Sequence, residues 1–474
     1  MNKTVRNSAV YMSGTIIMAI LGFASTMILT RILSTRVYAM YGLLNTFSTA
    51  AITFIAFGCD AAYSRFYYEH NRSQKNFIIT SLKLPIIIFV IFVLAIIEPS
   101  HYIIKYIFEE NLPLLTVAIM LIYILFAFIQ RFSQITARME EYAGNYIFSN
   151  IIAKSGFILF IIISVVVFKK ASFDTVLLSF MLSSIAALSV NIFVLLKTGN
   201  NKNISGKSIS YKDFLLYGFP YMINNVLILV IPVIEKVVIR DLAGWEILGI
   251  FTAASIFQTV VLLIVNTLDN IWNPLVYKNY RNTEAFKPIL HTFGLMATLI
   301  ISLGLSACIL LRRWLVLLLD SSYYSVYIIA PTVMFGAFFN IIAMIYGVGI
   351  NISKKTVHYI ISPALQAVIS ILLCYLTIPK LGLIGVGIST LVSIIASRMY
   401  RVVVGLYYYD TGTPEFKNIF IYVICAVSSV VSMFCTSLTA DIIISLSVTA
   451  LTFIIFSKEF KPLLKDVKKL IQTK

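Results

Sequence analysis

Charged side chains lie inside several long apolar segments of this sequence. Lys154 lies about nine residues into the apolar run at 145–168, roughly 13 Å along a helix and so close to its middle. An ionisable group deep in a membrane costs about 2.5–3.5 kcal/mol on insertion scales and usually faces a partner or a cavity. Lys154 is therefore the strongest candidate to bind an anion, and a structural pair with a buried carboxylate is the alternative.

Three further cations lie closer to the ends of apolar runs. Lys83 and Arg131 are near the ends of the runs at 77–97 and 113–136, where a long side chain can reach the membrane surface. Arg131 shares one helical face with Gln134 and Arg138, which predicts a polar stripe if that face lines a cavity. Arg31 closes the run at 8–30, where an anchor at the membrane surface is the alternative to a binding role.

The run at 214–239 contains two prolines and two asparagines. Pro220 and Pro232 are expected to interrupt the helix, because proline removes a backbone donor. Such breaks expose carbonyl groups and permit bending, which suits a transporter. Asn224 and Asn225 lie near the middle of the run and are candidates to contact a polar substrate.

Four other charged residues are candidates for gating or ion coupling. Glu235 and Lys236 lie one turn before the end of the same run, on different faces. The glutamate is the better candidate, since the lysine can reach outward. Asp60 and Asp269 end the runs at 38–60 and 247–268 at equivalent places, and ordinary helix ends at the membrane surface explain them equally well.

The segments that position these residues are predicted membrane helices. The 474 residues are 59% hydrophobic and 12% charged, with a mean hydropathy of +0.93. The apolar runs are about 20 residues long, enough to cross a bilayer as helices, and they lack the alternation of barrel strands. We expect about 14 spans, at 8–30, 38–60, 77–97, 113–136, 145–168, 173–196, 214–239, 247–268, 288–311, 326–349, 357–378, 382–404, 418–438 and 440–457.

The net charge of +17 follows the predicted topology. Most lysines and arginines fall in alternate connections and in the two tails, and the positive-inside rule places these segments in the cytoplasm. Both termini are then cytoplasmic. The charge is explained by orientation in the membrane, and no nucleic-acid partner is expected.

The spans form two similar groups of six. An offset of 209 residues superimposes the first six spans on the next six, which predicts two parallel repeats with a substrate site between them. The expected fold is an all-α polytopic membrane protein with an N-lobe at 1–196, a cytoplasmic linker at 197–213, a C-lobe at 214–404, an additional helical hairpin at 405–457 and a basic tail at 458–474. The tail is predicted to be either an amphipathic helix on the inner leaflet or solvated.

Motifs of soluble enzymes are missing from the sequence. The four histidines have no metal-ligand spacing, and there is no P-loop or GxSxG motif. The glycines at 379–390 open an apolar span, so they indicate close helix packing and a tight turn. We expect no enzymatic activity, no metal and no cofactor, apart from a coupling ion, H+ or Na+, that the sequence does not identify.

Three passages resemble one family of transporters. LTRILSTRVYAMYGLL at 29–44, YGFPYMINN with VIEKVVIRDLAGWEILGIF at 217–251, and IPKLGLIGVGIST at 378–390 occur in an order and spacing similar to the polysaccharide transporter (Wzx-type) branch of the multidrug/oligosaccharidyl-lipid/polysaccharide (MOP) flippase superfamily. This resemblance implies that undecaprenyl-pyrophosphate-linked oligosaccharides cross the bacterial plasma membrane by alternating access, for O-antigen (lipopolysaccharide), capsule or exopolysaccharide assembly.

The resemblance also implies roles for the candidate residues. Lys154, with Lys83, Arg131 and Arg31, would meet the pyrophosphate, and Asn224 and Asn225 the sugars. The implied partners are the lipid-linked oligosaccharide, membrane lipids, a glycan polymerase and chain-length machinery, with the oligomeric state left open between a monomer and larger assemblies. Two alternatives remain: an ion-coupled multidrug exporter, which should have acidic groups deep in its cavity, and a membrane glycan polymerase or transferase, which should have a large outer loop.

Overall fold

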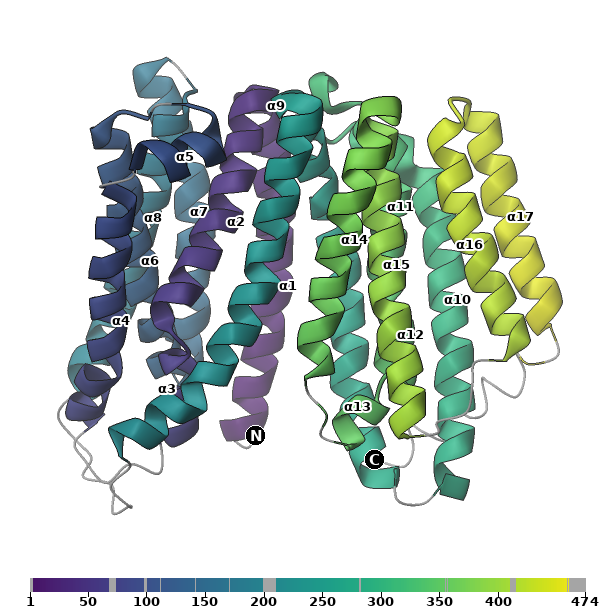
Figure 1. Ribbon diagram of the computed structural model, residues 1–474, viewed down its shortest axis with the longest axis horizontal. Helices are drawn as coiled ribbons and strands as arrows, with labels where there is room; N and C mark the ends of the chain where they lie inside the picture. Colours follow the sequence, from purple (N-terminus) through teal and green to yellow (C-terminus); the bar gives the residue numbers. More distant parts are fainter. Residues whose placement is uncertain are drawn as a thin grey trace. The chain divides into compact units, whose positions relative to one another are not determined.

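The computed structural model describes residues 3–67, 74–97, 100–110, 112–140, 142–169, 171–198, 210–280, 283–353, 355, 357–409, 415–457 and 459, in which all regular elements are helices (Figure 1). The predicted all-α membrane fold is confirmed. Thirteen helices in these ranges are long and apolar enough to cross a membrane. One of them, α9 (Tyr211–Asn279), contains two of the fourteen predicted spans, which explains the difference in number.

Contacts divide the chain into two compact units, unit 1 at 1–237 and unit 2 at 238–474. The predicted repeat and the predicted boundaries of lobes, linker and hairpin stay predictions. The linker between 199 and 209, and nearly all of the basic tail, lie outside the described residues.

Unit 1 is built on three helices that pack on one another, α6, α7 and α8, with α1 packed on α7 and α2 on α6. Leu29, Leu44, Ile124 and Ile161 from four of these helices are fully buried. Besides the first part of α9, the elements of unit 1 are α1 (Lys3–Ile32), α2 (Thr35–Ala56), α3 (Cys59–Phe66), α4 (Gln74–Ile97), α5 (Ser100–Phe108), α6 (Leu114–Met139), α7 (Ala143–Phe168) and α8 (Phe173–Thr198).

The span predicted at 38–60 ends earlier than expected. Phe57 and Gly58 both have left-handed backbone angles, with φ of 47° and 72°, so α2 stops at Ala56 and α3 starts in a new direction. A Cβ atom on Gly58 would lie 1.9 Å from the carbonyl oxygen of Gly218 in α9. Glycine at 58 therefore allows both the turn and direct backbone contact with α9.

The break in α9 lies at a glycine and not at the prolines. The helix is continuous through Pro220 and Pro232, and its one non-helical residue is Gly244, with φ of 83°. The expected interruptions at the prolines are therefore wrong. Proline keeps a helical φ and removes only one hydrogen bond, which membrane helices tolerate, whereas Gly244 has the left-handed φ that other residues avoid.

Unit 2 contains, after the second part of α9, the elements α10 (Thr283–Val316), η1 (Ser321–Tyr323), α11 (Val326–Phe338), α12 (Asn340–Tyr346), α13 (Gly349–Ile352), α14 (His358–Leu381), α15 (Leu383–Tyr408), α16 (Phe416–Phe434) and α17 (Leu438–Phe456). Long helices α14 and α15 lie side by side (Figure 1). Gly382, with φ of 54°, forms the turn between them, and a Cβ on Gly385 would lie 2.6 Å from the Thr377 carbonyl oxygen. The tight turn and close packing predicted for this passage are confirmed.

The span predicted at 326–349 is divided into α11, α12 and α13. The region is deeply buried and lies against α15. A Cβ on Gly349 would lie 1.9 Å from the carbonyl oxygen of Gly405, and one on Gly405 would lie 2.5 Å from Cα of Gly347. These glycines let α12 and α13 meet the backbone of α15, which brings Asn340 beside that helix.

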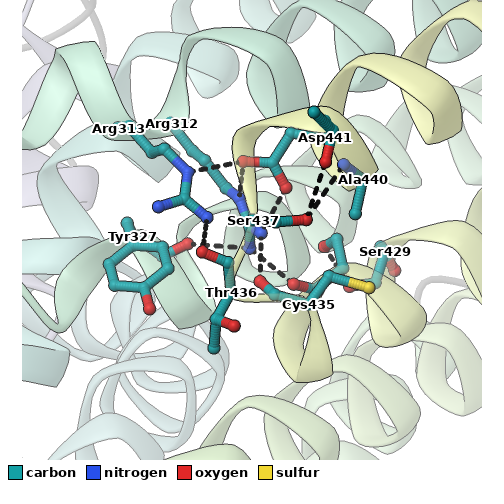
Figure 2. Close-up of polar contacts among 11 residues, drawn as sticks. Arg312, Arg313, Tyr327, Ser429, Cys435, Thr436, Ser437, Ala440 and Asp441 are labelled. Carbon is teal, nitrogen blue, oxygen red and sulfur yellow. Dashed lines mark hydrogen bonds and ion pairs between the residues drawn. The ribbon is translucent and has the colours of Figure 1, made fainter.

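A buried ion-pair network fixes the last two helices to α10 (Figure 2). Arg312 and Asp441 are completely buried, and Nη2 of the arginine donates to Oδ1 of the aspartate at 2.5 Å. Arg312 also donates to the carbonyl oxygens of Ser432 at 2.6 Å and Cys435 at 2.7 Å. Arg313, which is partly exposed, reaches Oδ2 of Asp441 at 2.8 Å. The carboxylate and these carbonyl groups therefore hold the hairpin of α16 and α17 on α10.

Candidate functional site

One face of α2 presents hydroxyl groups to two cations of unit 1. Nζ of Lys236, on the first part of α9, donates to Oγ1 of Thr46 at 2.7 Å and to the Gly42 carbonyl oxygen at 2.8 Å. Two turns further along α2, Thr53 accepts a hydrogen bond from Nη1 of Arg131 at 3.3 Å. Thr46 and Thr53 share a face because seven residues make almost two helical turns. We call this surface the α2 polar face.

The left-handed turn after α2 brings Asp60 to Arg131 on α6. Both Nε and Nη2 of Arg131 donate to Oδ2 of Asp60, at 3.0 and 2.6 Å. The other carboxylate oxygen accepts from the backbone N–H of Ala61 at 2.9 Å, in the first turn of α3. Asp60 is buried and Arg131 is about one-third exposed. The candidate binding residue and the candidate coupling residue thus form one ion pair.

The polar stripe predicted on α6 continues onto α7. Gln134 donates to the amide oxygen of Asn150 at 3.3 Å, and Asn150 donates to the Tyr146 carbonyl oxygen at 2.8 Å. Asn150 lies one turn before Lys154 on the same helix. Arg138, the third member of the stripe, is exposed near the end of α6. Each of these two amides lies about one helical turn from a cation, Gln134 from Arg131 and Asn150 from Lys154.

Lys154 lies near the middle of α7 and is held by a backbone group. Its Nζ donates to the Met18 carbonyl oxygen of α1 at 3.0 Å, and a Cβ on Gly22 would come within 3.1 Å of that nitrogen. Within the described residues, no carboxylate pairs with this lysine. An ion pair between Lys154 and a buried carboxylate, which was the alternative to anion binding, is therefore not found within the described residues.

The exposed side chain of Lys154 does not lie on the apolar surface of α7. That surface carries the exposed residues Phe148, Leu159, Ile162, Ile163, Val166 and Val167, from which Lys154 is about 80° or more around the helix. A membrane helix presents such an apolar stripe to lipid. Lys154 is thus solvent-accessible on a face that α7 turns toward other helices of unit 1.

Lys83 has the opposite placement. It is exposed in the centre of a stripe on α4 formed by Ile79, Ile87, Val90 and Leu94, each more than half exposed. This arrangement favours a lipid-facing lysine whose ammonium group reaches the membrane surface. Within the described residues, no hydrogen bond or ion pair joins Lys83 to the groups that contact Lys154, Arg131 or Lys236.

The remaining candidates are distributed along three helix segments. Arg31 is exposed in the last turn of α1. Asn225 and Glu235 are half-buried in the first part of α9, and Asp269 is half-buried in its second part; the side chain of Asn224 lies outside the described residues. Asp269 lies within a continuous helix, whereas Asp60 follows a turn, so their environments differ.

Sequence reasoning missed two groups of arginines in unit 2. Arg398 and Arg401 lie within the predicted span at 382–404 but were not identified as candidates, and Arg312 lies just beyond the predicted span at 288–311. In the structure Arg398 and Arg401 lie inside α15, and Arg312 lies inside α10. The signal was present, since SRMYRVVVGL places two arginines one helical turn apart in an apolar run.

The described groups suit recognition of a polar anion. Unit 1 offers ammonium, hydroxyl and amide donors along α2, α6 and α7, and the described residues contain no group of three or more histidine, cysteine or acidic side chains placed to hold a metal ion. Cations and amides of this kind bind phosphates and sugar hydroxyls.

Solved structures of transporters share this fold. The chain is similar to lipid II flippase MurJ in an inward closed conformation, with a TM-score of 0.66 and 16% identity over 96% of this chain and 100% of that chain. An inward-facing multidrug resistance MATE family transporter of the MOP superfamily gives a TM-score of 0.65 and 15% identity over 82% and 94%. The outward-facing conformation of such a transporter gives 0.57 and 16% over 85% and 94%.

A search among curated protein sequences finds no match. The family model described as polysaccharide biosynthesis protein matches residues 4–276, which is more than half of the sequence. The resemblance noted from the three sequence passages is thereby confirmed. On this match, the chain belongs to the polysaccharide biosynthesis protein family, and it shares its fold with MurJ and with MATE family transporters of the MOP superfamily.

Proposed function

We propose that this protein translocates a polyprenyl-diphosphate-linked oligosaccharide across the bacterial plasma membrane by alternating access, with both termini in the cytoplasm. The observation that carries the proposal is Lys154: a mid-helix lysine, exposed away from the apolar stripe of α7, whose ammonium group has a carbonyl oxygen as its partner. An ammonium group in that position can accept an anionic partner from a substrate.

The physical demand on a flippase is to replace water around a charged headgroup. A diphosphate carries at least two negative charges, and its transfer into hydrocarbon without compensation is prohibitive. Lys154 supplies a positive charge, and the α2 polar face and the amides of Gln134 and Asn150 supply hydrogen-bonding groups for sugars. The polyprenyl chain needs no such groups and can remain in lipid.

Export of surface glycan in a deletion strain tests this function. Lys154→Ala should reduce export at least tenfold at equal membrane abundance, because the anion then meets no cation at mid-depth. Lys83→Ala is the matched control, since it removes a lysine from a lipid-facing stripe and should leave export close to wild type. Full export by Lys154→Ala would remove this lysine from the mechanism and with it the proposal.

A multidrug exporter is the second candidate, because the fold is also that of a MATE family transporter. Such a function calls for a carboxylate available to cationic drugs or coupling ions. In the described part of unit 1, the buried carboxylate of Asp60 is already engaged by Arg131. Dye efflux without glycan export in the same deletion strain would favour this candidate. The coupling ion and any polymerase partner stay predictions.

A further inference from the structure

Two arginines lie one helical turn apart inside α15, in a long stretch of the chain without acidic residues. Arg398 and Arg401 are neighbours at i and i+3, so their Cβ atoms are about 5–6 Å apart. Between residues 321 and 409 the sequence contains no aspartate or glutamate. The elements that pack most on α15 are α11, α12, α13 and α14, and all four come from this acid-free stretch.

Arg398 is held in place by neutral oxygen atoms. Its Nε donates to the amide oxygen of Asn340 at 2.6 Å, and its Nη1 donates to Oγ of Ser397 at 3.0 Å. Asn340 is itself oriented, because its Nδ2 donates to the Ala337 carbonyl oxygen at 2.8 Å. The guanidinium group is thus positioned without being neutralised.

Arg401 has a different set of neighbours. Its guanidinium carbon lies 4.6 Å from the ring centre of Tyr359, at the start of α14. Its Nε is fully buried and has no hydrogen-bond partner within the described residues. Leaving a buried donor of a charged group without an acceptor is unfavourable, because the group has lost its water and gained no hydrogen bond. The cation–π contact offsets only part of that cost.

No described group on the packed elements supplies the missing negative charge. The titratable side chains on these elements are His358 and Lys380, which are neutral or cationic, together with a cysteine and tyrosines. His358 is engaged by the hydroxyls of Tyr400 at 2.7 Å and Tyr408 at 3.3 Å. Within the described residues, these two guanidinium groups one turn apart therefore have no acidic partner, and like charges in a low-dielectric setting repel.

We propose that Arg398 and Arg401 form a second anion site, in unit 2, for the phosphate group of a lipid. Guanidinium forks match phosphate oxygens and form charge-assisted hydrogen bonds of about 2.7–2.9 Å. The phosphate supplies the absent counter-charge, and Nε of Arg401 gains an acceptor. An anionic phospholipid and a polyprenyl diphosphate offer the same chemistry. The site does not depend on which substrate the protein transports.

Thermal stability of the delipidated protein in detergent tests the site. Inorganic pyrophosphate should raise the midpoint of unfolding of the wild type in a saturable way, since a ligand that binds the folded state stabilises it. Arg398→Gln and Arg401→Gln should each raise the half-saturating concentration at least tenfold. Lys380→Gln, at the far end of α14, is the control and should respond as the wild type does.

Lipid probes then identify the source of the phosphate. Phosphatidylglycerol and undecaprenyl diphosphate are compared with undecaprenol, which lacks the phosphate. The phosphate lipid that stabilises wild type at the lower concentration, and loses this effect in Arg401→Gln, is the ligand. Stabilisation that persists in both arginine variants, or no stabilisation of wild type by any phosphate compound, overturns the proposal.

A purely structural role for Arg401 gives a different result. In that case Arg401→Gln lowers the unfolding midpoint equally with and without pyrophosphate, which also overturns the proposal. Arg401→Lys keeps the charge but loses the fork, and it should bind pyrophosphate with intermediate affinity. Because these measurements report binding, they can succeed even if Lys154→Ala exports glycan normally, so the two proposals fail separately.

Discussion

The guanidinium group of Arg131 and the carboxylate of Asp60 form an ion pair between α6 and α3, with Nη2 at 2.6 Å from Oδ2. This pair neutralises one positive and one negative charge of unit 1 at the end of the α2 polar face. In this conformation Arg131 is not free to meet a phosphate, whereas the one partner of Lys154 within the described residues is a backbone carbonyl oxygen.

Removing the charge of Asp60 should destabilise the protein, and the size of the loss should depend on whether Arg131 is present. Asp60→Asn leaves Arg131 without its charged partner, and loss of hydrogen bonds between charged groups costs about 1.5–3 kcal/mol. We expect a lower unfolding midpoint for Asp60→Asn and a smaller loss for Asp60→Asn combined with Arg131→Gln. Thermal unfolding in detergent provides the double-mutant cycle, and additive losses would show that the two residues do not interact.

Lys236 should link the first part of α9 to α2. Lys236→Met removes both hydrogen bonds to Gly42 and Thr46, so hydrogen exchange in the middle of α2 should become faster. Thr46→Val removes only the hydroxyl acceptor and should have the smaller effect. Exchange that is unchanged in Lys236→Met would show that this contact does not fasten the two helices.

Alanine substitutions at three glycines can distinguish the effect of backbone strain from the effect of steric contact. Gly58→Ala combines a left-handed φ with a clash 1.9 Å from Gly218, Gly244→Ala has the φ alone, and Gly144→Ala has neither. A residue other than glycine costs roughly 1–3 kcal/mol in such sparsely populated backbone conformations, so membrane abundance should fall most for Gly58→Ala, less for Gly244→Ala and not for Gly144→Ala. Equal abundance of the Gly58 and Gly244 variants would argue against tight backbone contact.

The buried pair of Arg312 and Asp441 should dominate the stability of the last hairpin. Breaking a buried ion pair by removing one partner costs about 3–5 kcal/mol, because the other charge stays buried. We expect Asp441→Asn to lower the unfolding midpoint by several degrees, and Arg312→Met with Asp441→Leu to recover much of the loss. Arg313→Gln, at a partly exposed position, should change the unfolding midpoint little. A large decrease for this variant would contradict the claim that the Arg312–Asp441 pair contributes most of the stability.

The sequence predicted the features that depend on local composition. Apolar length located the helices, and an isolated charge in an apolar run identified Lys154 as unusual. The sharp turn near Gly382 followed from glycine spacing. These properties depend on a few residues that are close in sequence, so they can be predicted without knowing how the helices pack.

Partnerships between distant residues could not be predicted in this way. Asp60 and Arg131 are 71 positions apart, and Asn340 and Arg398 are 58 apart. Each pairing depends on a backbone feature: the left-handed turn at Gly58, or the glycine contacts that place α12 on α15. Proline also misled the prediction for α9, because its effect on a helix depends on the surrounding packing, whereas Gly244 fixes its own conformation.

The network around Arg312 has an evolutionary consequence. A homologue that stops before α16 would lose Asp441 and the carbonyl groups of Ser432 and Cys435 together. Any arginine kept at position 312 would then lie in an apolar environment without these partners. An arginine there and the final pair of helices should be gained or lost as a set. The residue aligned with Arg312 should then tell, from sequence alone, whether a relative has twelve membrane crossings or more.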